Sequence, residues 1–95
     1  MEVTPRLIID YITPDGKDIF NDWLMSLKDG QTKAIIGTRI ERVKSGNLGD
    51  CKPVGEGVFE LRFTSGIRIY YAEMGRIVIL LLCGGNKSSH AKDIL

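Results

Sequence analysis

The alternation of hydrophobic and polar positions predicts a strand and then a helix in the first third of the chain. Residues 6–12 mix β-branched and aromatic side chains and end at the turn-forming segment Thr13–Gly16, which predicts a first strand. Apolar residues then recur on one helical face, with Asp15 as a candidate N-cap and Asp29-Gly30 as the end. The residues of this face are Ile19, Phe20, Trp23, Leu24 and Leu27.

A second helix and a strand-rich half are predicted to follow. Residues 31–45 place apolar side chains on one helical stripe and end at Gly46-Asn47, whereas residues 48–57 contain three glycines and Pro53 and are predicted to be a loop. Residues 58–63, 67–72 and 76–83 are separated by short turns, which predicts an antiparallel meander whose last strand is covered on both faces. The predicted fold is therefore α+β, in the order β-α-α-β-β-β, with a small, mostly antiparallel sheet packed against two helices.

Length and composition predict one domain spanning residues 1–95. The chain has 95 residues, of which 43% are hydrophobic, enough for one core. Its longest apolar run, residues 77–83, is far shorter than the ~20 residues that cross a bilayer, and the first residues lack the pattern of a signal peptide. We therefore expect a cytoplasmic protein with no membrane partner. Ser89 can begin a helix over residues 90–95, but so short a segment predicts a C-terminal helix that is short or missing.

Candidate chemistry does not include a metal or a cofactor. Cys51 and Cys83 are expected to remain thiols in a reducing compartment, and with the single His90 they do not form a ligand set at zinc spacing. The charge is more informative when it is divided along the chain. Residues 1–32 contain three basic and six acidic residues, whereas residues 33–87 contain nine basic and five acidic ones. The formal net charge of +1 thus hides a basic second part.

Basic residues occur both on the second predicted helix and on one face of the predicted sheet. Those of the helix fit either a solvated face or a contact with nucleic acid. With a period of two, Glu60 and Arg62 share a face, and Arg68 and Tyr70 share the corresponding face of the next strand. Because a tight turn joins these strands, Arg62 and Arg68 should lie close together, either as a phosphate clamp or as cross-strand ion pairs with Glu60.

Four segments together resemble the RelE/HigB-like toxins of bacterial type II toxin–antitoxin modules, in particular the addiction module killer proteins. These segments are DGK…DWL at 15–24, GDCKPVGEGVFELR at 49–62, GIRIYY at 66–71 and LLCGGNKS at 81–88. The resemblance covers nearly the whole chain. It implies a metal-independent endoribonuclease that cleaves mRNA, typically on the ribosome. It also implies a helix-turn-helix antitoxin as partner, through which alone operator DNA would be bound.

The resemblance also assigns site residues. Arg68 matches the phosphate-binding arginine of the family, Lys87 a basic residue after the last strand, and Arg62 a supporting arginine, while Glu60 is a candidate base or an ion partner of the arginines. The candidate RNA-binding residues are Lys52, Tyr70, Tyr71 and His90, although one of the two tyrosines should belong to the core. An alternative function is a catalytically weak or inactive RelE-like module that binds its antitoxin and acts as a promoter corepressor.

Overall fold

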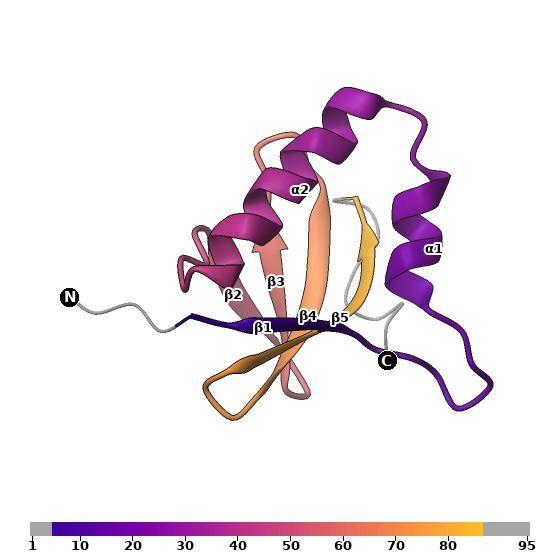
Figure 1. Ribbon diagram of the computed structural model, residues 1–95. Coiled ribbons are helices and arrows are strands. Elements are labelled where there is room, and N and C mark those ends of the chain that lie inside the picture. Colours follow the sequence, from indigo (N-terminus) through magenta and orange to yellow (C-terminus); the bar gives the residue numbers. More distant parts are fainter. Residues whose placement is uncertain (1–4, 87–95) are drawn as a thin grey trace.

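The fold of residues 5–86 consists of one five-stranded sheet and two helices (Figure 1). The computed structural model describes these residues, except for the side chain of Val78. The strands are ordered β1-β5-β4-β3-β2 across the sheet; β1 is parallel to β5, and the other neighbours are antiparallel. The predicted α+β class is confirmed. The elements are β1 (Leu7–Asp10), α1 (Ile19–Ser26), α2 (Gly30–Lys44), β2 (Cys51–Gly55), β3 (Val58–Arg62), β4 (Arg68–Met74) and β5 (Val78–Gly85).

Both helices cover the same face of the sheet (Figure 1). Phe20 of α1 and Ile36 and Val43 of α2 pack against strand side chains of that face, and these buried residues form one hydrophobic core. The strand side chains of the core are Leu61, Ile69, Tyr71, Ile79 and Leu81. Because strand side chains alternate between faces, the side chains between them lie on the face without helices.

The first helix is shorter than predicted and begins later. Its N-cap is Asp18, whose carboxylate accepts a hydrogen bond from the amide of Asn21 at 2.9 Å. Asp15 was the wrong candidate because its carboxylate instead accepts a hydrogen bond from the hydroxyl of Thr13 and lies 3.7 Å from Lys17, both within the preceding turn. The helix ends at Ser26, and a separate N-cap, Asp29, starts α2.

The predicted loop at residues 48–57 contains a strand. Residues 51–55 form β2, which pairs with β3 at one edge of the sheet. An edge strand tolerates Pro53 because it needs ladder hydrogen bonds on one side only. The connecting residues Glu56 and Gly57 have φ of 55° and 76°, as in the two-residue turns that suit a twisted hairpin. The prediction of a loop was therefore wrong, because the proline and glycines of this segment belong to a hairpin at the sheet edge.

Gly84 allows α1 to approach β5 closely. A Cβ atom at this position would lie 2.2 Å from the ring of Trp23, far inside van der Waals contact. The neighbouring part of β5 lies between β1 and β4 in the sheet, with Ile79 and Leu81 buried on the helix side and Leu80 half-buried on the other. The glycine thus fixes the position of α1 over the end of this strand.

None of the helices described for residues 5–86 is long and apolar enough to cross a membrane. The predicted short C-terminal helix lies outside the described residues.

Candidate active site and basic groove

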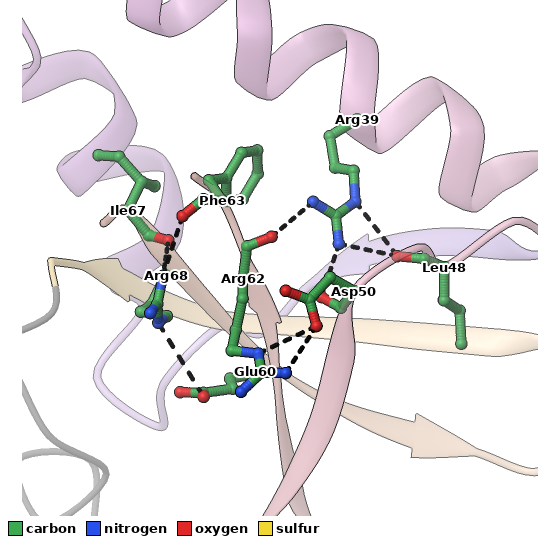
Figure 2. Close-up of polar contacts among 8 residues, drawn as sticks. All are labelled: Arg39, Leu48, Asp50, Glu60, Arg62, Phe63, Ile67 and Arg68. Carbon is green, nitrogen blue, oxygen red and sulfur yellow. Dashed lines mark hydrogen bonds and ion pairs between the residues drawn. The ribbon is translucent and has the colours of Figure 1, made fainter. Parts of the chain in front are cut away.

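Arg62 and Arg68 are direct cross-strand partners, as the sequence predicted. The first ends β3, the second begins β4, and the tight turn between the two strands sets this register. Their neighbours Leu61 and Ile69 point into the core, so the two arginines lie on the face without helices. Figure 2 shows Arg68 directed toward Glu60, which precedes Arg62 by two residues on β3, and the guanidinium of Arg62 directed toward Asp50.

Asp50 holds the guanidinium of Arg62. Nε and Nη2 of the arginine donate to the same carboxylate oxygen at 3.0 and 2.7 Å. These hydrogen bonds are the main reason why the pKa of Asp50 lies below its usual range, and the positive charges of Arg62, Arg39 and Arg68 add to this effect. Asp50 is therefore a permanent anion beside Arg62 at neutral pH.

Arg68 is anchored by the turn that joins β3 to β4. Its Nη1 donates to the carbonyl oxygens of Phe63 and Ile67 at 3.2 and 2.9 Å. Its Nε lies 4.0 Å from a carboxylate oxygen of Glu60, and only 16% of the arginine side chain and 11% of the glutamate side chain are exposed. Among residues 5–86, no acceptor is bonded to Nη2 of Arg68. This guanidinium is thus held rigidly and retains donor capacity for an anionic ligand.

Two of the predicted RNA-binding residues lie beside Glu60. Lys52 of β2 is its direct partner on one side and is exposed, and Tyr70 of β4 is its partner on the other side. Tyr70 is 3% exposed. Tyr71 is a core residue, as one of the two tyrosines was expected to be; it is 1% exposed and stacks on Phe59 at 5.5 Å. Neither ring presents an open face to a base in this structure.

Two site residues from the sequence, Lys87 and His90, lie outside the described residues. Within the part of the chain that is described, no cluster of three or more histidine, cysteine, aspartate or glutamate side chains could hold a metal ion. The described site therefore consists of two arginines, a buried carboxylate and a lysine, together with Asp50.

Arg39 is a central residue that the sequence analysis did not single out. This side chain of α2 donates four hydrogen bonds to three carbonyl oxygens, those of Leu48, Asp50 and Arg62, at 2.7–3.1 Å. Its guanidinium also lies over the ring of Phe63, 4.9 Å from the centroid. As Figure 2 shows, Arg39 joins α2 to the segments that carry Asp50 and Arg62.

A signal for Arg39 existed in the sequence. It lies three residues after Ile36 and four before Val43, both buried, and so belongs to the inward stripe of α2. Gly49, with φ of 68°, lies beneath its guanidinium, where a Cβ atom would be 3.1 Å from Nε. The sequence suggested that the basic residues of α2 form either a solvated face or a contact with nucleic acid. Arg39 does neither in this structure, because its guanidinium binds main-chain carbonyl groups.

A groove of about 730 Å³ opens between α2 and the turn from β3 to β4. Its charged lining consists of four arginines and one aspartate, a balance of +3: Arg39, Arg42, Arg62, Arg68 and Asp50. This is the size of an ordinary ligand pocket, and its charge favours an anion. Because Arg62 and Arg68 line it, the groove adjoins the site on the sheet.

Comparison with known proteins finds a similar protein in Haemophilus influenzae. No protein-family model matches the chain, and no solved structure matches it. The chain is 46% identical over 77 residues to an uncharacterized protein of Haemophilus influenzae, an alignment that covers 79% of this chain and 78% of that protein. The chain therefore belongs to the same family as this Haemophilus influenzae protein.

Proposed function

We propose that this protein is a RelE/HigB-like toxin, a metal-independent endoribonuclease that cleaves mRNA on the ribosome. The observation that supports the proposal most directly is the cross-strand pair of Arg62 and Arg68, with Glu60 beside it on the same face. Planar guanidiniums bind phosphate oxygens in pairs and stay charged at any physiological pH. The sequence segments that resemble the toxins contain these same residues.

In the proposed reaction, the two arginines hold the scissile phosphate. The ribose 2′-oxygen attacks phosphorus and loses its proton to a base, and the bond from phosphorus to the 5′-oxygen breaks as that oxygen gains a proton from an acid. The products are a 2′,3′-cyclic phosphate and a 5′-hydroxyl. Arg68, with an unused Nη2 donor among the described contacts, stabilises the negative charge that grows on the phosphate oxygens.

Glu60 is the carboxylate placed to act as the base. It is 8% exposed and lies diagonally opposite Arg68, with a carboxylate oxygen 4.0 Å from Nε of that arginine. The resemblance assigns the acid to a basic residue after the last strand, Lys87, with His90 as a further candidate. Lys52, exposed opposite Glu60, supplies a further cation for the RNA backbone.

The same proposal defines the partners. A helix-turn-helix antitoxin would neutralise the protein and recruit it to operator DNA, and the protein itself would act in the cytoplasm. A small open reading frame for such an antitoxin beside this gene is expected.

A second candidate function is a RelE-like corepressor that binds its antitoxin without cleaving RNA. The guanidinium of Arg62 donates two hydrogen bonds to Asp50, and that of Arg68 donates two to carbonyl groups of the turn from β3 to β4. Contacts of this kind favour a purely structural role for both arginines. This candidate predicts a stable antitoxin complex together with intact mRNA.

Induced expression in a bacterial host distinguishes the two functions. The wild-type protein should arrest growth and produce new mRNA ends, and Arg68→Ala combined with Lys87→Ala should abolish both effects. Arg76→Ala is the matched control, because this exposed arginine lies in the turn between β4 and β5, at the opposite end of β4 from Arg68. Arrest that persists in the double variant contradicts the site, and an antitoxin-binding wild type that cuts no mRNA favours the corepressor.

A further inference from the structure

The groove beside α2 has a surface that the proposed cleavage site does not use. One wall is formed by α2, where Ala34, Thr38 and Arg42 are exposed and Ile35 has 51% of its surface exposed. The other wall is the turn from β3 to β4 with Phe63 at its base. Cations and an apolar wall thus meet in one concave surface.

Arg42 is a cation of this groove that is unpaired among the described residues. Its guanidinium is exposed and forms no hydrogen bond or ion pair with any residue from 5 to 86. Arg39 contributes positive charge from a fixed position, because its donors are bonded to three carbonyl oxygens. The groove therefore combines a preorganised charge with one mobile side chain that can follow a ligand.

We propose that this groove binds single-stranded RNA next to the scissile phosphate, with a backbone phosphate at Arg42 and a base against the apolar wall of Ile35. The proposal rests on the proposed function, because it takes the same RNA as ligand. Proteins that bind single strands combine a positive groove along the backbone with apolar or aromatic surfaces under the bases. The shared lining residues Arg62 and Arg68 make the path continuous from the cleavage site into the groove.

The balance of +3 in the groove also explains how a chain with a net charge of +1 binds a polyanion. Each phosphate neutralised on a single strand contributes about 0.7 to the slope of log affinity against log salt. A local contact of this kind needs no strongly basic protein, since affinity depends on the field at the groove.

The test is a titration of the full-length protein with a single-stranded 2′-O-methyl RNA octamer, which cannot be cleaved, followed by NMR at low and moderate salt. Arg42→Gln should weaken binding about five-fold and reduce the salt slope by about 0.7. Thr38→Glu should bind more weakly than Thr38→Gln, a variant of the same size without the charge. Lys44→Gln is the matched control, because Lys44 is on the same helix but pairs with Glu41 outside the groove.

The outcomes separate this inference from the proposed function. Shifts of α2 resonances on titration, together with the losses above, support the groove. If Arg42→Gln and Thr38→Glu bind like their controls while mRNA is still cleaved, the RNA takes another path and the groove proposal is wrong. If the octamer at millimolar concentration shifts no α2 resonance, the groove does not bind RNA, whatever the cleavage assay shows. An absence of cleavage by the wild type overturns the proposed function, whereas the titration with the octamer decides by itself whether the groove binds RNA.

Discussion

Asp50 accepts both hydrogen bonds from Arg62 with a single carboxylate oxygen, at 2.7 and 3.0 Å. This is the contact that a phosphate oxygen would make with the same guanidinium. Asp50 therefore occupies the ligand position of Arg62, and RNA must displace it or share the arginine.

Replacement of this carboxylate should strengthen RNA binding. Asp50→Asn removes the competing charge and leaves the main-chain carbonyl that accepts from Arg39. We expect RNA affinity to rise about two- to five-fold, the range of an exposed ion pair, measured with the octamer titration. Asp15→Asn is a control in which the charge change is the same but the position is the turn before α1. Equal affinity of Asp50→Asn and wild type would show that Asp50 does not compete with RNA.

Loss of Arg39 should destabilise the fold. Arg39→Met keeps the aliphatic length but leaves carbonyl oxygens of Leu48, Asp50 and Arg62 without their charged donor. We expect the free energy of unfolding in urea to fall by about 2–4 kcal/mol. Arg42→Met, at an exposed position of the same helix, should change it by less than about 0.5 kcal/mol. Similar small losses in both variants would contradict the structural role of Arg39.

Two glycines should respond to alanine in opposite directions. Gly84→Ala places a methyl group on the ring of Trp23 and should cost about 1–3 kcal/mol or more. Gly37 lies on α2, and a Cβ atom added there would have nothing within 4 Å. Gly37→Ala should therefore raise the free energy of unfolding by up to about 1 kcal/mol through helix propensity. Urea denaturation of both variants checks the packing of α1 on β5. A Gly84→Ala protein as stable as wild type would contradict that packing.

The half-buried position of Asp10 beside Asp18 should make the free energy of unfolding depend on pH. Burial, and next the hydrogen bond and charge of Asp18, raise the pKa of Asp10 from 3.8 to about 6. A carboxyl whose pKa is raised by folding stabilises the protein below its unfolded pKa, and that contribution is lost as pH rises through about 6.

Asp10→Asn should therefore be more stable than wild type at pH 7 by on the order of 1 kcal/mol after solvent screening, and the difference should shrink toward pH 4. Parallel stability curves of the variant and wild type between pH 4 and 7 would contradict the raised pKa. Asp22→Asn, an exposed acidic residue in the first turn of α1, serves as the charge control.

The sequence predicted the parts of the fold that follow from local pattern. Alternation placed Arg62 and Arg68 on one face, and the short turn between their strands placed them side by side. The hidden strand β2 could not be predicted in this way, because Pro53 and the glycines are tolerated only once β3 supplies the ladder at the sheet edge.

The site was predictable in its charges but not in its pairings. That Asp50 would meet Arg62 depends on the turn at Glu56-Gly57, which brings residues 12 apart in sequence together. The inward stripe of α2 indicates that Arg39 faces the sheet, but its carbonyl partners at Leu48 and Arg62 leave no signature in side-chain patterns. Tyr70 is 3% exposed although it lies on the face without helices, so the alternation alone did not predict its burial.

The chemistry of the RNA ends tests the proposed cleavage reaction most directly. Purified protein is added to ribosomes that translate a defined message, and the termini of any new fragments are identified. We expect fragments with a 2′,3′-cyclic phosphate and a 5′-hydroxyl, which disappear with Arg68→Gln and persist with Arg76→Gln. An uncut message, or fragments that carry a 5′-phosphate and a 3′-hydroxyl, would contradict it.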